Sequence, residues 1–472
     1  MSPPNLDASG ASTCCHVVAM PYPGRGHINP MMALCRPLAA RGVAVTFVVT
    51  EEWLGLLQSS PAPPPGVRLR TIPNVIPSEK GRAADFNGFL EAVYTKMEDP
   101  VEQLLDRLEP PVTAIVADTY LPWAVALGNR RNIPVISLFT MSASFFSVLY
   151  HFDRLPVAGD RPLLVDESDA DEPLEQFFPC LASVRLADFR TVRSVLTLRQ
   201  ALEAFSWVRK AQCVLFTSFY EIEACVIDAL RAELSCPVYP VGPSIPYMTL
   251  EEKPKERILL NGSGKDYFDW LDSQPKSSVL YVSLGSFLSV SSSQMDEIAM
   301  GLRSSETRFL WVARGDSSQV QEMSGVMGLV VPWCDQLKVL CHPSVGGFLT
   351  HCGWNSTLEG MFTGVPMLTF PISWDQPPNS RLIVDEWKVG LSLKEMVRKD
   401  EVVGREEIAK TIKRFMEDTV ENREMRRRAA ELREASHRAI QDGGSSWTNF
   451  NSFVRDLLDA SITCSLSYQK EK

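Results

Sequence analysis

Short apolar runs alternate with amphipathic stretches along most of the chain. In the first half, HVVAMPYP, VAVTFVVT, TAIVAD and IPVISLFT suit buried strands, and CVLFTSF precedes a helical EIEACVIDALRAEL and an extended PVYPVGP. A second series begins at SVLYVSLGS and continues through FLWVAR, GLVVP, GGFLTH and PMLTFP before the chain ends in helical sequence. This alternation predicts βα units built around parallel sheets, which is an α/β fold.

The alternation breaks once, between about residues 244 and 266, where Pro, Gly, Lys and Glu occur without an apolar period. We therefore predict a Rossmann-like N-terminal domain over 1–243, a linker over 244–266, a Rossmann-like C-terminal domain over 267–454 and a C-terminal segment over 455–472. A chain of 472 residues is long for one domain and sufficient for two. Two facing doubly wound sheets would place ligands in the cleft at the carboxyl ends of their strands.

Composition narrows the class of partner. Apolar residues make up 45% of the chain and charged residues 22%, and the net charge of -10 argues against nucleic acid or an anionic membrane as the main partner. The polar start MSPPNLDASGASTCC lacks the features of a signal peptide, and no apolar run is long enough to span a bilayer. Eleven cysteines without a regular framework predict free thiols in a reducing compartment. We expect a cytoplasmic protein without membrane insertion.

The most informative segment runs from Trp333 to Gln376 and reads WCDQLKVLCHPSVGGFLTHCGWNSTLEGMFTGVPMLTFPISWDQ. Within it, the apolar GGFLTH suits a buried strand. Ser356, followed three residues later by Glu359, forms a capping box that predicts the start of a helix. A helix N-terminus presents unpaired N–H groups and a partial positive charge, so we expect a diphosphate to bind there.

Side chains around this helix start suit the other parts of a nucleotide sugar. Trp333 offers a flat face for a base, and Asp375 with Gln376 offers a fork for vicinal sugar hydroxyls. The side-chain donors at the diphosphate end are His351, Asn355 and Ser356. One ligand of this shape reaches all of these residues.

This segment resembles the signature box of the plant UDP-dependent glycosyltransferases that act on small molecules. Both ends, the HCGWNS core with Gly353, the following Glu and the final DQ fall at the spacing of that family, and weaker agreement runs through most of the chain. The resemblance implies the GT-B fold, which has two facing doubly wound Rossmann-like domains. It also implies that the first domain binds the acceptor, that the second binds the UDP-sugar, and that the last helix packs back on the first domain.

The resemblance further implies a role for each side chain in the box. The implied contacts are Trp333 stacked on uracil, Gln336 with uracil or ribose, Glu359 with the ribose hydroxyls, His351, Asn355 and Ser356 with the diphosphate, and Trp354, Asp375 and Gln376 with the sugar. A final Gln is usually associated with glucose, so UDP-glucose is the expected co-substrate and no resident cofactor is expected. Each residue alone has an ordinary structural use, and only their combination in one pattern favours binding.

A candidate catalytic pair lies in the first half. His27 follows two glycines in PYPGRGHINP, and Asp118 ends the strand-like TAIVAD. At the rim of the sheet, a carboxylate on one imidazole nitrogen would fix the tautomer and leave the other nitrogen to deprotonate an acceptor hydroxyl. In the resembling family, the matching His is the base and the matching Asp its partner. We expect attack on the anomeric carbon from the face opposite UDP, with inversion to a β-glucoside.

Two further residues are expected near the donor, and other positions depart from the family pattern. Ser286 in VSLGS would donate a hydrogen bond to the departing UDP, and Thr140 matches a family position that touches a sugar hydroxyl. Trp374 stands where smaller residues are frequent, PPNS follows the final DQ, and Arg25 replaces the usual Gln beside the histidine. A bulky ring before the DQ would reshape the sugar edge, so UDP binding is better supported than a strict choice of glucose.

The acceptor is the part that the sequence constrains least. The resemblance implies a lipophilic small molecule, and the aromatic residues of the first half that could surround one are Phe145, Phe146, Tyr150, Phe177, Phe178 and Phe189. Aromatic residues at helical spacing are more often core than pocket, so none of these is singled out. We expect a monomer that binds a UDP-sugar and a lipophilic acceptor.

Other interpretations are less well supported. PGRGHINP imitates a dinucleotide fingerprint, but Asn29 stands where a third glycine is needed. Asp169 and Asp171 form an Asp-x-Asp motif inside an acidic stretch typical of a solvated loop, and we predict no metal. A zinc site would have to be built without a Cys-x-x-Cys pair, from Cys334, Cys341, His342, His351 and Cys352. A non-catalytic UDP-sugar sensor with the same fold stays open, although both members of the catalytic pair are present.

Overall fold

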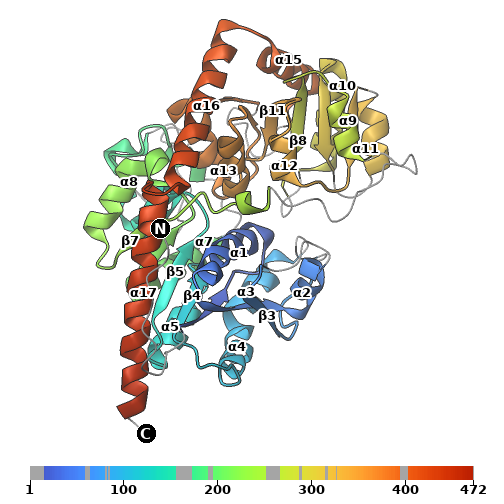
Figure 1. The fold of residues 1–472 in the computed structure, drawn as a ribbon. Helices are drawn as coiled ribbons and strands as arrows, with labels where there is room; N and C mark the ends of the chain where they lie inside the picture. Colours follow the sequence, from blue (N-terminus) through green and yellow to red (C-terminus); the bar gives the residue numbers. More distant parts are fainter. Residues whose placement is uncertain are drawn as a thin grey trace.

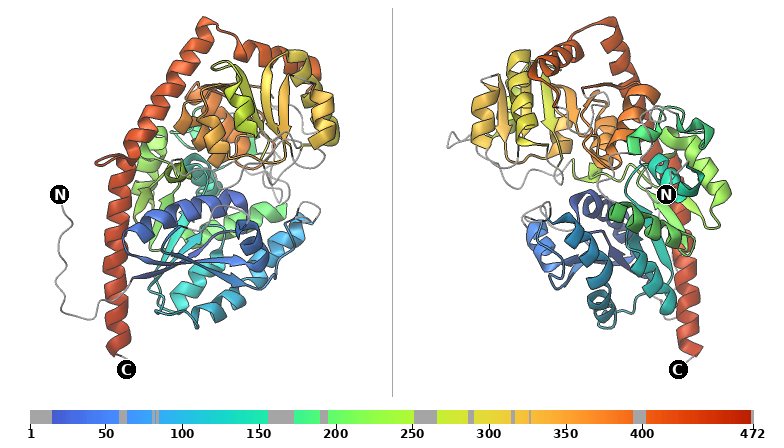
Figure 2. Two further views of the ribbon diagram at one scale, coloured as in Figure 1. Left: turned by 45° about the vertical axis from the view of Figure 1, so that its right-hand side comes forward. Right: turned by 180° about the vertical axis from the view of Figure 1, so that it is seen from behind.

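The computed structural model describes residues 15–58, 64–79, 82, 85–155, 173–189, 195–250, 266–285, 290–313, 317–325, 327–393 and 402–470. Within these residues, two parallel sheets lie in separate layers, each with helices on both faces (Figure 1). Figure 2 shows the same two layers from two further sides. This is the α/β class expected from the alternation of apolar and amphipathic segments.

The first sheet has seven strands within the described residues, in the order β3-β2-β1-β4-β5-β6-β7. Its strands are β1 His16–Met20, β2 Ala44–Thr50, β3 Val67–Ile72, β4 Ala114–Asp118, β5 Val135–Phe139, β6 Cys213–Phe216 and β7 Val238–Pro240. Its helices are α1 Arg25–Ala40, α2 Glu51–Gln58, α3 Phe86–Lys96, α4 Glu98–Leu105, α5 Pro122–Arg130, α6 Ala143–Tyr150, α7 Val195–Val208 and α8 Tyr220–Glu233. The strand order reverses between β1 and β4, which is where doubly wound sheets bind ligands.

The second sheet has six strands within the described residues, in the order β10-β9-β8-β11-β12-β13. Its strands are β8 Val279–Ser283, β9 Arg308–Val312, β10 Gly328–Val331, β11 Val345–Thr350, β12 Met367–Thr369 and β13 Gly390–Ser392. The remaining helices are α9 Tyr267–Asp272, α10 Ser292–Ser305, α11 Ser317–Ser324, α12 Gln336–Leu340, α13 Trp354–Thr363, α14 Gln376–Arg381, α15 Arg405–Met416, α16 Val420–Ile440 and α17 Ser445–Lys470. We call the part built on the first sheet the N-terminal domain and the part built on the second the C-terminal domain.

Strand burial explains why the central strands could be read from the sequence. Strands β1, β4 and β5 are buried along their whole length, as continuous apolar runs of a parallel sheet require. Two strands were not predicted. β3, with the sequence VRLRTI, lies at the edge of its sheet and carries two arginines, and β13 is only three residues long.

Helix α17 lies along the N-terminal domain, and α16 lies along the C-terminal domain (Figure 2). The apolar face of α17 shares one buried cluster with the strands of the first sheet through Phe450, Phe453, Val454 and Leu457. The Tyr239 hydroxyl of β7 also donates a hydrogen bond to Asp456. The last helix therefore ties the end of the chain to the first sheet. The three boundaries between the predicted segments stay predictions, and residues 251–265 of the expected linker lie outside the described residues.

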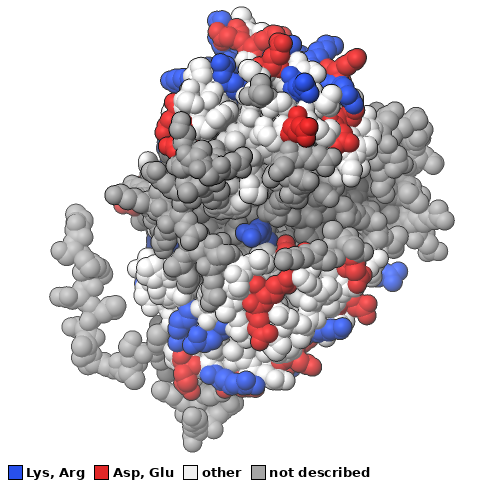
Figure 3. Space-filling view, turned by 90° about the vertical axis from the view of Figure 1, so that its right-hand side faces the viewer, with Lys and Arg blue, Asp and Glu red and all other residues white. Residues whose placement is uncertain are grey.

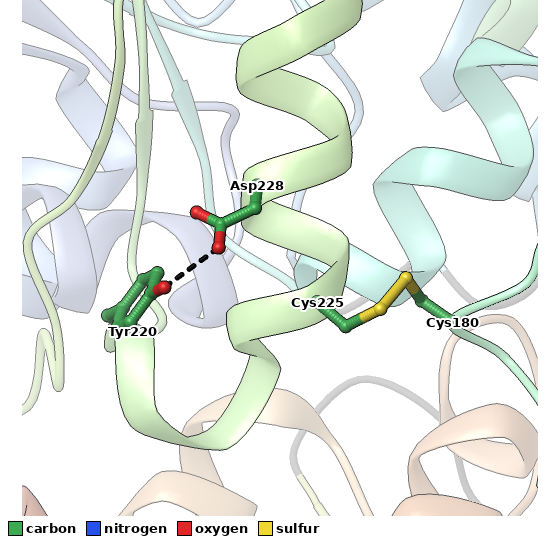
Figure 4. The surroundings of a disulfide bond; sticks show 4 residues. All are labelled: Cys180, Tyr220, Cys225 and Asp228. Atoms are coloured by element: carbon green, nitrogen blue, oxygen red, sulfur yellow. Dashed lines mark hydrogen bonds between the residues drawn. A yellow bond between two sulfur atoms is a disulfide. The ribbon is translucent and has the colours of Figure 1, made fainter.

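A disulfide corrects the expectation that the cysteines are free thiols. Cys180 and Cys225 are bonded, with their Cα atoms 5.6 Å apart (Figure 4). Cys225 lies on α8, and the chain after the short 3₁₀ turn at Leu174–Gln176 brings Cys180 beside it from 45 residues away. No short-range cysteine spacing in the sequence predicts this disulfide. The cysteines that form no disulfide within the described residues are Cys15, Cys35, Cys213, Cys236, Cys334, Cys341 and Cys352.

The surface and the helices add two observations about possible partners. On the face seen in Figure 3, Lys and Arg are interspersed with Asp and Glu over both layers. None of the helices in the described part of the chain is both long and apolar enough to cross a membrane.

Candidate active site

A cavity of about 840 Å³ lies between the two domains. Its walls come from the segments that follow the carboxyl ends of strands in both sheets, among them the loops after β1, β4 and β5 and those after β8, β11 and β12. Both domains thus contribute to one ligand site, at the position where open parallel sheets bind ligands.

The N-terminal wall brings together three side chains that are far apart in the sequence. Nδ1 of His27, in the first turn of α1, lies 2.7 Å from Oδ2 of Asp118 at the end of β4. The Thr140 hydroxyl, directly after β5, lies 2.9 Å from the same ring nitrogen. The three residues meet because β1, β4 and β5 are adjacent in the sheet. Thr140 thus contacts the imidazole in this structure, whereas the resemblance implied a contact with the sugar.

The hydrogen bonds define what the histidine can do. The Asp118 side chain is 1% exposed, and its other oxygen accepts a hydrogen bond of 3.0 Å from the backbone N–H of Tyr120. An ionised carboxylate only accepts, so Nδ1 of His27 carries the hydrogen and Nε2 is left with a lone pair. The imidazole side chain is 15% exposed and lines the cavity. This arrangement suits a general base.

The C-terminal wall centres on α13, whose start differs from the prediction. The helix begins at Trp354 with Gly353 as its N-cap, and no side chain caps it, so the predicted capping box of Ser356 and Glu359 is wrong. The turn from β11 into α13 passes through Cys352, which has φ +66°, and this starts the helix before Ser356 is reached. Both predicted capping oxygens instead accept hydrogen bonds from Gln336 Nε2, at 3.0 Å to Ser356 and 2.5 Å to Glu359.

His351, near the start of α13, is placed to contact a diphosphate. His351 sits between two glycines, because a Cβ on Gly285 or Gly353 would come within 2.6 or 2.5 Å of its Nε2. Burial lowers the pKa of His351 to about 4, with a smaller opposing effect from the Ser283 carbonyl, so the ring is neutral at pH 7. Its Nδ1 has no hydrogen-bond partner among the described residues. A neutral imidazole beside a helix N-terminus can donate to a phosphate oxygen.

Asn355 occupies the same helix start but also contacts the other domain. Its Nδ2 donates to the Gly26 carbonyl at 2.9 Å, one residue before His27. Its Oδ1 is buried without a hydrogen-bond partner in the described part of the chain. The contact links the expected diphosphate end of the C-terminal wall directly to the loop that carries the histidine.

The nucleoside end of the wall contains an ordered network. Gln336, at the start of α12, accepts a hydrogen bond of 3.1 Å from the buried Tyr281 hydroxyl, and this orients its amide toward Glu359. Burial raises the pKa of Glu359 to about 7, opposed by the Gln336 hydrogen bond and increased by the charge of Asp335. Trp333 is 45% exposed and lines the cavity, so one face is available for stacking. Tyr281 could not be predicted from the sequence, because a tyrosine in a strand carries no signal of this contact.

The expected sugar end lies at the turn from β12 into α14. Burial raises the pKa of Asp375 to about 6, opposed by the Asn379 hydrogen bond and by the positive charge of a protonated His27. Gln376 uses its carbonyl oxygen to accept from two backbone N–H groups, so only its NH₂ group can face a sugar. Asn379 was missed by the sequence analysis. Its Nδ2 donates to Asp375 at 2.7 Å, and the four-residue helical spacing between them was the available signal.

The remaining candidates are Trp354, the residues that lie outside the described ranges, and the metal ligands considered in the sequence. Trp354 is 2% exposed and lines the cavity, and its Nε1 has no hydrogen-bond partner among the described residues. Ser286 and the Asp169 and Asp171 pair lie outside the described residues. In the described part of the chain, no group of three or more His, Cys, Asp or Glu side chains is arranged to hold a metal ion. His342, one of the candidate zinc ligands considered in the sequence, instead pairs with Asp272 at 3.0 Å.

The aromatic lining of the cavity differs from the aromatic residues considered in the sequence. Phe145, Phe146, Phe178 and Phe189 are buried in the core of the N-terminal domain. Aromatic side chains that line the cavity are Tyr22 after β1, Phe86 and Tyr94 on α3, Tyr120 after β4 and Trp374 after β12. Apart from Trp374, they could not be predicted, because only tertiary folding brings these segments to one cavity.

Comparison with known proteins settles the family. A family model described as UDP-glucoronosyl and UDP-glucosyl transferase matches residues 260–423. UDP-glycosyltransferase 87A2 of Arabidopsis thaliana is 48% identical over 452 residues, which cover 94% of this chain and 96% of that protein. The chain belongs to the UDP-glycosyltransferases. Another member, 7-deoxyloganetin glucosyltransferase of Gardenia jasminoides, is 33% identical over 94% of this chain and 98% of its own.

Solved structures of UDP-glycosyltransferases share the fold. Medicago truncatula UGT71G1 complexed with UDP-glucose is 26% identical, with a TM-score of 0.77 over 94% of this chain and 98% of its own. Phytolacca americana UGT2 complexed with UDP-2fluoro-glucose and pterostilbene is 28% identical, with a TM-score of 0.77 over 94% and 99%. The predicted GT-B fold is confirmed, and this UDP-glycosyltransferase is an enzyme of sugar transfer from a UDP-linked donor.

Proposed function

We propose that this UDP-glycosyltransferase transfers glucose from UDP-glucose to a hydroxyl or carboxyl group of a lipophilic small molecule, giving a β-glucoside. The observation that carries the proposal is the His27 and Asp118 pair, 2.7 Å apart, facing the same cavity as the signature-box residues. The UDP-glucose bound to the Medicago relative and the pterostilbene bound to the Phytolacca relative support the two substrate classes.

The donor is held by the C-terminal wall in this proposal. Uracil stacks on Trp333, Glu359 accepts from the ribose hydroxyls with Gln336 beside it, and the diphosphate lies against His351, Asn355 and Ser356 at the start of α13. The sugar lies against Trp354, Asp375 and the NH₂ group of Gln376. The final Gln of the box supports glucose as that sugar, and a divalent metal has no assigned role.

The transfer is a single displacement. Nε2 of His27 takes the proton from the acceptor oxygen, and Asp118 stabilises the imidazolium that forms. The acceptor oxygen attacks the anomeric carbon from the face opposite UDP, the bond between that carbon and the diphosphate oxygen breaks, and the configuration inverts. Negative charge develops on departing UDP, where the neutral His351 and the N–H groups of α13 can stabilise it.

The acceptor class is proposed from the character of the cavity. Four aromatic side chains of the N-terminal domain line it, which suits a lipophilic compound with a flat or bulky apolar body; they are Tyr22, Phe86, Tyr94 and Tyr120. Fold alone does not choose among such compounds.

The cytoplasmic location and the monomeric state stay predictions. The free cysteines fit a reducing compartment, whereas the Cys180–Cys225 bond does not.

Mass spectrometry of the protein with UDP-glucose and a panel of lipophilic phenols, alcohols and acids tests the proposal. His27→Ala should lose roughly 10²- to 10⁴-fold in turnover while UDP binding, measured by calorimetry, is retained. His342→Ala is a matched control, because that ring also pairs with an aspartate, at 3.0 Å, but does not line the cavity. Near-normal turnover of His27→Ala would reject the histidine as the base.

A non-catalytic UDP-sugar sensor is the competing function. It predicts tight UDP-glucose binding without a hexose adduct on any compound of the panel, and identical behaviour of His27→Ala and the wild type. The two functions therefore give opposite results in the same experiment. Addition of a chelator and of manganese in parallel tests the expectation that transfer needs no metal.

A further inference from the structure

Trp374 adopts a backbone conformation that is unfavourable for a bulky residue. It has φ +64°, in the left-handed region that large side chains rarely occupy. The turn around it is held by Gln376, whose Oε1 accepts from the N–H groups of Ile372 at 2.8 Å and Ser373 at 3.1 Å. Strain of this kind persists where the surroundings fix it, and it is concentrated at functional sites.

The strained turn directs the indole across the cleft to the N-terminal domain. The Trp374 ring centroid lies 6.3 Å from that of Tyr120 and 5.5 Å from that of Phe145. Trp374 is therefore a residue of the C-terminal domain whose partners lie in the N-terminal domain.

Its partner and its neighbour in the chain both belong to the reaction centre. The Tyr120 ring centroid lies 6.1 Å from that of His27, and the Tyr120 backbone N–H donates to Asp118. Asp375, directly after Trp374, is buried and lines the same cavity as His27. The indole lines the same cavity as His27.

We infer that Trp374 is a specificity-determining residue that excludes water from the reaction centre, so that glucose passes to the acceptor rather than to water. This inference rests on the proposed glucosyl transfer. In the side reaction, a water oxygen bonds to the anomeric carbon, the bond to the diphosphate oxygen breaks, and the water proton passes to His27, giving glucose and UDP. A base that can activate an acceptor hydroxyl can activate water equally, so the enzyme needs a physical barrier against hydrolysis.

The geometry supports a barrier that forms only when the two domains are together. The indole from one domain and the Tyr120 and Phe145 rings from the other meet edge to face or tilted, which are favourable arrangements for aromatic pairs. Loss of the indole would leave space beside the anomeric carbon that water can fill. Loss of another interdomain contact, away from the cavity, should not have this effect.

The test measures UDP release and glucoside formation separately in the wild type, Trp374→Phe, Trp374→Gly and Trp374→Ala. We expect UDP-glucose hydrolysis without acceptor to rise about tenfold or more in Trp374→Gly and Trp374→Ala, and less in Trp374→Phe. Glycine tolerates φ +64°, so the melting temperature of Trp374→Gly should fall less than that of Trp374→Ala. A purely structural role would instead make hydrolysis and transfer fall together with stability.

Trp387→Ala is the matched control, because that indole donates to the Ile222 carbonyl across the domains at 3.3 Å and does not line the cavity. Its ratio of hydrolysis to transfer should equal that of the wild type. An unchanged hydrolysis rate in both Trp374→Gly and Trp374→Ala, with normal UDP binding, would overturn the inference. Absence of glucoside from the wild type with every acceptor would instead count against the proposed function, and the acceptor-free hydrolysis would still decide the role of Trp374.

Discussion

The two walls of the cavity are built in different ways. The C-terminal wall comes mainly from one continuous segment, Trp333 to Gln376, which folds as α12, β11, α13, β12 and the start of α14. The N-terminal wall is collected from the loops after β1, β4 and β5 and from helices α3 and α7. The proposed donor site is thus encoded locally, whereas the proposed base and acceptor surface depend on how distant strands align.

The electrostatics differ in the same way. On the C-terminal wall, burial shifts the pKa of His351 to about 4, of Asp375 to about 6 and of Glu359 to about 7. On the N-terminal wall, the titratable pair is defined instead by a direct hydrogen bond between His27 and Asp118. Donor binding should therefore respond to pH through buried carboxyl groups, and chemistry should respond to the partner of one imidazole.

The largest effect is expected when the partner of the imidazole is changed. Asp118→Asn keeps the size of the side chain, but its NH₂ group can donate to Nδ1 and place the ring proton on Nε2, the wrong nitrogen for a base. We expect turnover to fall by about 10²-fold or more, with an unchanged KM for UDP-glucose. Steady-state kinetics with each substrate varied in turn checks both parts.

Asp272→Asn provides the control, because it changes a histidine-aspartate pair outside the cavity. If Asp118→Asn raised the KM for UDP-glucose as strongly as it lowered turnover, the division of labour between the two walls would be wrong.

A smaller effect, confined to the donor, is expected from Glu359→Gln. Ribose hydroxyls donate to this carboxylate in the proposed complex, and hydrogen bonds to a charged group contribute about 1.5–3 kcal/mol each, so the KM for UDP-glucose should rise roughly ten- to hundredfold. The same substitution should leave turnover at saturating donor nearly unchanged. Kinetics at several donor concentrations measures the two parameters separately.

The pH dependence of donor binding gives the same comparison a second test. In the proposed complex the ionised form of Glu359 binds the ribose hydroxyls, so with a pKa of about 7 the KM for UDP-glucose should rise as the pH falls from about 8 to about 6. The slope should be absent in Glu359→Gln. The raised pKa also means that the folded state holds this proton more tightly than the unfolded state, so this group lowers stability as the pH rises through about 7. A wild-type KM that is independent of pH over this range would contradict the assignment.

The contrast between the walls also explains what could be predicted. The strands from β1 to β12 could be placed, apart from the edge strand β3, because apolar runs mark buried strands. His27 and Asp118 could be paired because both follow strands of one parallel sheet. The start of α13 was misplaced, since the αL turn at Cys352 is not visible in the side-chain pattern. Tyr120 and Tyr94 reach the cavity, and with it the proposed acceptor surface, only through tertiary folding.

The disulfide tests whether the long-range ties of the N-terminal domain matter to the donor. Replacing both members, Cys180→Ser with Cys225→Ser, removes a cross-link between residues 45 positions apart and should lower the free energy of unfolding by about 2–4 kcal/mol. Chemical denaturation of the oxidised wild type and the double variant measures this loss. The reduced wild type should match the double variant.

The KM for UDP-glucose of the double variant shows whether the N-terminal domain affects the wall proposed to bind the donor. Near Cys180, Asp188 contacts Arg381 of α14 at 3.4 Å, so the segment touches the C-terminal domain without lining the cavity. Because the donor wall is folded from its own continuous segment, the KM for UDP-glucose should change less than about twofold in the double variant, below the scale of one lost hydrogen bond. A larger rise in that KM, at a temperature where the variant is fully folded, would mean that the N-terminal domain shapes the donor wall across the interface and that the local encoding of the donor site is incomplete.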